Sequence, residues 1–91
     1  MIYITHVRMS PSNSRQHEHI THVYWTEYGT SREGSWTKQQ AVDWINGGGD
    51  ARVSTGPMFD VEVRVVDAQP PYLRTVANGF YADNLLSLPR F

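Results

Sequence analysis

Apolar and polar residues alternate in several stretches of this sequence, and each such stretch predicts a β-strand. The clearest is 61–65, Val-Glu-Val-Arg-Val, whose strict alternation is typical of a strand with one buried face. Residues 2–9 and 19–27 are rich in β-branched and aromatic residues, which also favour strands. A polar loop at 10–18 separates these two segments. We therefore expect an antiparallel hairpin with a long connection.

The two strands of this hairpin are near copies of each other, because the sequence Ile-Thr-His-Val occurs once in each. A symmetric register places His6 opposite His22 and Tyr3 opposite Trp25. Neither face of the hairpin is uniformly apolar. The pattern therefore does not indicate which face is buried, and it specifies the register weakly.

One α-helix is expected, after a loop at 28–35. Thr37 followed by Gln40 has the form of a capping box, in which each side chain bonds the backbone N–H of the other residue. Gly47 follows the last helical residue, as is usual at the C-terminus of a helix. A helix of about ten residues is not stable alone in water, so it must pack on the sheet. Its apolar stripe consists of Ala41, Val42, Trp44 and Ile45.

The C-terminal part of the chain contains the strongest turn signal. Asn78 and Gly79 both tolerate positive φ, which a tight two-residue hairpin turn requires. We therefore expect 72–77 and 80–83 to pair as antiparallel strands.

Together these elements predict a single domain, 1–91, of the α+β class. We expect a mostly antiparallel sheet of four to five strands in the order β-β-α-β-β-β, with one helix packed on one face. Residues 51–55 are compatible with a further short strand. Residues 84–88 are expected to form a turn of helix that Pro89 closes.

The hairpin register brings together the candidate site residues. Counting outward from the two-residue turn places Arg74 opposite Asp83. The favoured interpretation is an ion pair that holds the open end of the hairpin together, with Asp83 also capping the following turn. The alternative is that Arg74 is presented to an anionic ligand or partner, beside Tyr72 and Tyr81 on the same face. The candidate binding residues are therefore Tyr72, Arg74, Tyr81 and Asp83.

The apolar tail, 85–91, is expected to fold back over the sheet. A domain of this size needs every large apolar side chain that it has. An exposed docking segment and insertion into a second subunit are the alternatives.

Composition and charge narrow the classes of function. The net charge is −1, and no stretch is strongly basic, which argues against strong non-specific binding of nucleic acid. The absence of cysteine excludes a disulfide framework and favours the cytoplasm. No apolar run approaches the roughly 20 residues of a membrane helix, and the N-terminus does not read as a signal peptide. We therefore expect a cytoplasmic protein that does not bind a membrane.

The histidines are the residues most typical of a metal site. His6 and His22 could face each other across the hairpin, but His19 falls on the opposite face from His22, and His17 lies in a loop. No catalytic, metal-binding or nucleotide-binding motif is present. The sequence therefore predicts no metal, no cofactor and no catalytic residues, and an enzyme is the less favoured class.

Short segments along almost the whole chain resemble a bacterial and phage family known as domain of unknown function 3892. They are 4–8, 19–20 with Trp25, the helix from Trp36 to Ile45, 72–75 and 83–89, of which the last is the most distinctive. The resemblance implies a small stand-alone cytoplasmic protein, often in a phage or prophage setting. It implies no activity.

The leading hypothesis is an interaction or accessory module that binds another protein or forms a homodimer. The resemblance implies that it is phage or prophage encoded. Its basis is abundant aromatic residues, near-zero charge and no reactive motif. One alternative is a nucleic-acid-binding module that uses sheet aromatics with Arg8, Arg64 and Arg74. Another is a small metal-binding protein or enzyme.

Overall fold

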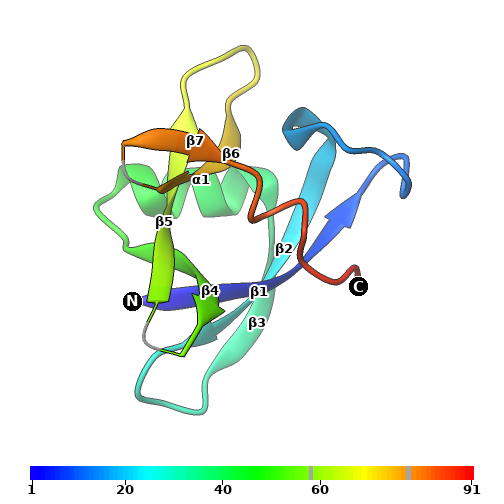
Figure 1. The fold of residues 1–91 in the computed structure, drawn as a ribbon. Helices are drawn as coiled ribbons and strands as arrows, with labels where there is room; N and C mark the ends of the chain where they lie inside the picture. The colour runs from blue at the N-terminus through cyan, green and yellow to red at the C-terminus, as the bar shows by residue number, and fades with distance from the viewer. Residues whose placement is uncertain (58, 78) are drawn as a thin grey trace.

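The computed structural model describes residues 1–57, 59–77 and 79–91, and the side chains of residues 80 and 81 are also left out of the description. Figure 1 shows the elements. In chain order they are β1 (Ile2–Met9), the 3-10 turn η1 (His17–His19), β2 (Ile20–Glu27), β3 (Glu33–Thr37), α1 (Lys38–Asn46), β4 (Ala51–Gly56), β5 (Phe59–Val66), β6 (Tyr72–Ala77) and β7 (Phe80–Ala82).

The strands form one sheet in the order β3-β2-β1-β4-β5-β6-β7, with β1 and β4 parallel and all other neighbours antiparallel. The α+β class and the mostly antiparallel sheet are confirmed. The predicted number of four to five strands and the order β-β-α-β-β-β are wrong, because the described chain holds seven strands and β3 precedes the helix.

Strand β3 is the element that the sequence did not indicate, since its first residues were assigned to a loop at 28–35. It is an edge strand that pairs only with β2. Its outward positions are polar, and only Gly34 and Trp36 turn toward the interior. A strand with so few apolar residues is formed by its pairing with β2, which no local pattern reveals.

The β1–β2 hairpin is confirmed, but its symmetric register is wrong. His6 lies opposite Tyr24 instead of His22, and Tyr3 does not face Trp25. The observed pairs are Ile2 with Glu27, Tyr3 with Thr26, Ile4 with Trp25, His6 with Tyr24, Val7 with Val23, Arg8 with His22 and Met9 with Ile20.

Two β-bulges change the register along this hairpin. Thr5 is the extra residue in β1, and Thr21 is the extra residue in β2. A bulge shifts the inward and outward alternation by one position. In β1 the next buried residue after Ile4 is therefore Val7 instead of His6. This shift explains why neither face of the hairpin is uniformly apolar in the sequence.

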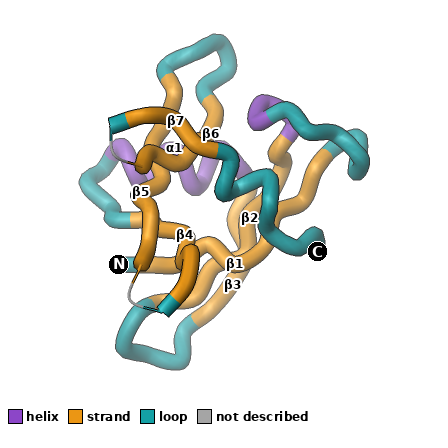
Figure 2. The backbone as a smooth tube through the Cα atoms, viewed as in Figure 1, coloured by secondary structure: helices purple, strands orange, loops and turns teal. Residues whose placement is uncertain are grey.

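Helix α1 shows that the sheet is strongly curved. It contacts β2 and β3 near one end of the strand order and β5 and β6 near the other, so both halves of the sheet bend toward it. In Figure 2 the helix lies behind β5 and β6. The predicted capping box is present: Gln40 N–H donates to Thr37 Oγ1 at 3.2 Å, and Thr37 N–H donates to Gln40 Oε1 at 2.9 Å. Among the described residues, no helix is long and apolar enough to cross a membrane.

The three tryptophans pack in a row between the sheet and the helix. The ring of Trp36 lies 4.9 Å from that of Trp25 and 5.4 Å from that of Trp44, measured between centroids. Gly49 follows the helix closely, and a Cβ atom at this position would lie 2.3 Å from the ring of Trp44. The exit from the helix therefore passes over the indole ring at a distance that only glycine allows.

The β6–β7 hairpin has the predicted register, with Ala77 opposite Phe80, Val76 opposite Tyr81 and Thr75 opposite Ala82. Of the predicted turn, Asn78 lies outside the described residues, and Gly79 has the expected positive φ of 82°. The helical turn expected at 84–88 is not formed as a helix. Hydrogen-bonded turns stand in its place, from Leu86 N–H to Asp83 O and from Leu88 N–H to Leu85 O.

The tail, residues 85–91, folds back over the molecule as predicted. Leu85 is fully buried in the core, and Leu86 and Leu88 pack against it. The tail then runs beside β1, where Val7 N–H donates to Pro89 O at 3.1 Å and Phe91 N–H donates to Val7 O at 3.3 Å. Figure 1 shows it crossing from β7 to β1 in front of the sheet.

The tail can lie beside β1 because β4 pairs only with the first residues of β1. The parallel β1–β4 pairing covers only Ile2 and Tyr3 on β1. The backbone groups of Val7 on that side would otherwise have no partner, and buried backbone groups without partners are costly. The tail therefore replaces β4 as the neighbour of β1.

Candidate functional site

The predicted ion pair at the open end of the β6–β7 hairpin is present. Arg74 Nη2 lies 3.0 Å from Asp83 Oδ1, and the Arg74 side chain is about three-quarters buried whereas that of Asp83 is exposed. The backbone carbonyl of Asp83 accepts from Leu86 N–H and from Ser87 Oγ, so this residue also begins the turn of the tail. Asp83 therefore joins the hairpin to the tail.

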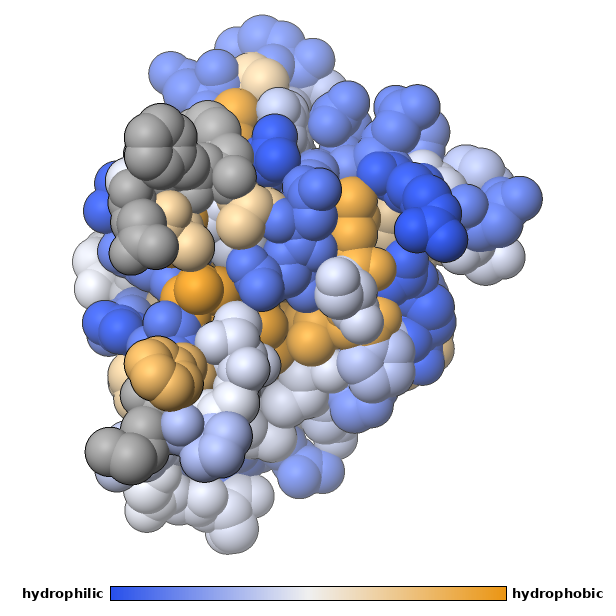
Figure 3. Space-filling view, viewed as in Figure 1, coloured by the Kyte–Doolittle hydropathy of each residue, from blue (hydrophilic) through white to orange (hydrophobic). Residues whose placement is uncertain are grey.

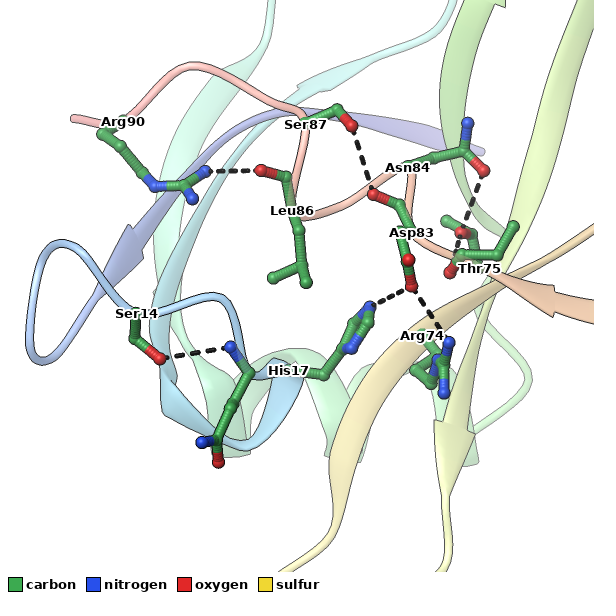
Figure 4. A network of polar contacts seen from close by, with 11 residues as sticks. Ser14, His17, Arg74, Thr75, Asp83, Asn84, Leu86, Ser87 and Arg90 are labelled. Carbon is green, nitrogen blue, oxygen red and sulfur yellow. Dashed lines mark hydrogen bonds and ion pairs between the residues drawn. The ribbon is translucent and has the colours of Figure 1, made fainter.

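His17 completes this junction, and sequence reasoning assigned it no role. It is 6% exposed, and its Nε2 lies 3.7 Å from Asp83 Oδ1. Figure 4 shows Asp83 between His17 and Arg74. Burial lowers the pKa of His17, Arg74 lowers it further, and the negative charges of Asp83 and Glu18 partly oppose them. His17 comes from η1, which packs on β6, and nothing local in the sequence announces that contact.

A second polar contact holds the start of the tail. Thr75 is fully buried on β6, and its Oγ1 lies 3.0 Å from Ala82 O and 3.1 Å from Asn84 Oδ1. A buried hydroxyl with two partners fixes the direction in which the chain leaves β7. The hairpin, η1 and the tail therefore meet as one connected network.

The two predicted tyrosines are not brought into this network by any described contact. Because Leu73 and Thr75 are buried, Tyr72 and Arg74 lie on the opposite face of β6. Tyr72 is half-buried there. The side chain of Tyr81 lies outside the described residues.

A groove lies beside the junction, where the loop between β1 and η1 meets the tail. We call it the loop–tail groove. Its volume is about 370 Å³, within the range of small binding sites. It is lined by Ser12, Asn13, Ser14 and Arg15 from the loop and by Leu86, Leu88 and Arg90 from the tail. Figure 3 shows apolar atoms at the centre of the face that the tail crosses, with hydrophilic residues around them.

Hydrogen bonds hold both walls of the groove. In the loop, Ser14 Oγ lies 2.6 Å from His19 Nδ1 and accepts from Gln16 N–H at 3.1 Å. In the tail, Arg90 Nη1 donates to the carbonyls of Leu86 at 3.1 Å and Leu88 at 2.8 Å. Sequence reasoning missed this groove, because its walls are about 70 residues apart in the chain and neither contains a motif.

The other histidines are bound to hydroxyl groups of the protein. His6 Nδ1 lies 2.9 Å from Thr5 Oγ1, and His22 Nδ1 lies 3.0 Å from Thr21 Oγ1. No three His, Asp or Glu side chains converge as metal ligands in the part of the chain that the structure describes.

The chain also matches a known family of proteins. Residues 3–89 match the family described as Protein of unknown function (DUF3892), as the resemblance of the sequence implied. No curated protein and no solved structure matches the chain.

Proposed function

Because the chain belongs to this family of unknown function, we propose a function from its own geometry: it is a small interaction module that binds a segment of another protein in the loop–tail groove. The observation that carries the proposal is the groove itself, built by two distant segments around Leu86 and Leu88, which are only partly buried. Partly exposed leucines in a concave site typically bind an apolar side chain of a partner.

Contacts within the protein hold both walls of the groove. Leu85 anchors the tail in the core, and the hydrogen bonds between Val7 and the tail hold it against β1. Ser14 is held by His19 on the other wall. A site that is ordered in the free protein loses less conformational entropy on binding, which favours affinity.

Two further observations favour a protein partner over nucleic acid. Trp25, Trp36 and Trp44 pack on one another, so their flat faces are largely used inside the fold. The net charge of −1 gives no general attraction for a polyanion. The cytoplasmic location and the phage setting implied by the resemblance remain part of this proposal.

Selection from a random peptide library on the full-length protein tests the proposal. Ser12→Trp places a bulky ring in the groove, and Ser31→Trp is the matched control in the exposed turn between β2 and β3. We expect selected peptides to bind the wild type and Ser31→Trp and to lose binding to Ser12→Trp. Equal binding to all three proteins, or no selected peptide, would refute the proposal. A dimer in light scattering that Ser12→Trp dissociates would assign the groove to a second copy instead.

A further inference from the structure

The cations of this protein divide into two groups by their partners. Four arginines form ion pairs with carboxylates: Arg32, Arg52, Arg64 and Arg74. The described structure shows no carboxylate partner for the other four of the eight Lys and Arg residues, which are Arg8, Arg15, Lys38 and Arg90.

Two of the four cations without described carboxylate partners line the loop–tail groove, and the other two contact residues that follow its walls in the chain. Arg15 and Arg90 line it. The guanidinium carbon of Arg8 lies 4.5 Å from the ring centroid of Phe91, the residue after Arg90. Lys38 Nζ donates to the carbonyl of Glu18 at 3.0 Å. Glu18 lies in η1, three residues after Arg15 in the chain. Arg8 Nε also donates to Phe91 O at 2.9 Å. Arg8, Lys38 and Arg90 thus bond backbone oxygens instead of acidic side chains, in a protein whose net charge is −1.

The described carboxylates do not pair with these cations. Asp83 is paired with Arg74. Glu18 is exposed and forms no ion pair among the described side chains. Glu33 accepts a hydrogen bond from the hydroxyl of Tyr24, whose ring packs on Phe91, and likewise forms no ion pair among the described side chains. Arg15 and Arg90 therefore line the groove without a described carboxylate partner, and an anionic partner would supply one.

Resting on the proposed function, we propose that the partner of the groove is an acidic peptide segment in which Asp or Glu flanks an apolar residue. The apolar side chain would lie against Leu86 and Leu88, and carboxylates would reach Arg15 and Arg90. Guanidinium groups bind carboxylates through paired hydrogen bonds with matched geometry.

Arg90 is prepared for this role. Its Nη1 is bonded to the carbonyls of Leu86 and Leu88, which fixes the guanidinium at the edge of the groove. Its Nε and Nη2 make no hydrogen bond to any described residue. Nε and Nη2 therefore remain as donors for a partner, and the hydrogen bonds of Nη1 hold the guanidinium in place.

A peptide is favoured over a phosphate backbone by the shape and lining of the site. The groove is lined by two leucines among polar residues and has a volume of about 370 Å³, which suits one or two side chains. Strong binding of nucleic acid depends on many phosphate contacts along an extended basic surface. Here two arginines, Arg15 and Arg90, line a single groove instead.

Fluorescence anisotropy with two labelled peptides tests the inference on the full-length protein. One six-residue peptide alternates leucine with aspartate, and the other replaces each aspartate with asparagine. We expect the aspartate peptide to bind about tenfold more tightly at low salt, the effect of two exposed ion pairs, and to lose this advantage at high salt. Arg15→Gln should reduce the advantage several-fold. Arg64→Gln, which removes the same charge from an ion pair outside the groove, should leave it unchanged.

The outcomes separate the two proposals. Equal binding of both peptides, sensitive to Ser12→Trp, would overturn the acidic partner and leave the groove as a peptide site. Binding of neither peptide, together with a failed library selection, would overturn both proposals. A single-stranded DNA of equal charge that binds more tightly than the aspartate peptide would replace the acidic peptide by a polyanion.

Discussion

Thr5 and Thr21 are the extra residues of two β-bulges, one in each strand of the same hairpin. Each hydroxyl donates across the hairpin, from Thr5 Oγ1 to Tyr24 O at 3.4 Å and from Thr21 Oγ1 to Arg8 O at 3.2 Å. Each also lies about hydrogen-bond distance from Nδ1 of the histidine that follows it. The repeated sequence Ile-Thr-His-Val is therefore a repeated bulge, in which threonine supplies the cross-strand bond that the shifted backbone lacks.

Removing the hydroxyl of Thr21 should destabilise the protein. Thr21→Val keeps the β-branched shape but removes the donor to Arg8 O, and we expect a loss of about 1 kcal/mol in the free energy of unfolding. Urea denaturation measures it. Thr26→Val is the control, because the Thr26 hydroxyl makes no hydrogen bond with any described residue. Equal losses in the two variants would show that the hydroxyl has no specific role in the bulge.

Acid should destabilise the protein through His17. The pKa of His17 is lowered in the folded state, so at low pH the unfolded chain binds a proton that the folded chain binds less readily. Stability should therefore be complete above the ordinary histidine pKa of about 6.5 and fall as the pH decreases below it.

Thermal unfolding between pH 7 and pH 5 measures this slope. His17→Gln should flatten the slope, whatever its effect on stability at pH 7, and His22→Gln should preserve it. A slope that persists undiminished in His17→Gln would assign the acid sensitivity to other groups.

Gly49→Ala should be one of the more harmful small substitutions in the chain. The new Cβ would lie 2.3 Å from the ring of Trp44, which must shift and disturb its packing on Trp36. We expect a loss of about 1–3 kcal/mol. Gly47→Ala is the control, since its nearest neighbour would lie at 3.4 Å and its φ of −79° suits alanine. Denaturant unfolding followed by tryptophan fluorescence compares the two, and similar midpoints would contradict the packing argument.

Leu85→Ala should loosen the whole tail. Leu85 is fully buried, so its truncation leaves a cavity and should cost about 2–5 kcal/mol. Leu86→Ala, at a half-buried position, should cost less. Hydrogen exchange of the Phe91 amide, which donates to Val7 O, should accelerate in Leu85→Ala. Unchanged protection there would mean that the tail is held independently of the core.

Features that depend on neighbouring residues could be predicted from the sequence. The Thr37–Gln40 capping box involves residues three apart, so residue type alone specifies it. The Asn-Gly sequence at 78–79 predicted the register observed between β6 and β7, and with it the Arg74–Asp83 ion pair. In both cases the partners are connected by a short chain that allows few geometries.

Features that depend on distant segments could not be predicted. Strand β3 exists because β2 offers it backbone partners. His17 is buried because η1 reaches β6, and the groove exists because the tail crosses to β1. The register of the β1–β2 hairpin, with its bulges at Thr5 and Thr21, also differs from the symmetric register that the repeated sequence made the simplest choice.

By itself, then, the sequence determined the class of the fold, its helix, the C-terminal hairpin and the folding back of the tail. Local backbone preferences and the need to bury apolar residues are sufficient for these. The tertiary structure alone decided where the sheet curves, which cations have no carboxylate partner and where a partner could bind. Those properties depend on which segments lie side by side, and in a sheet of this order the neighbours of a strand are set by the packing of the whole domain.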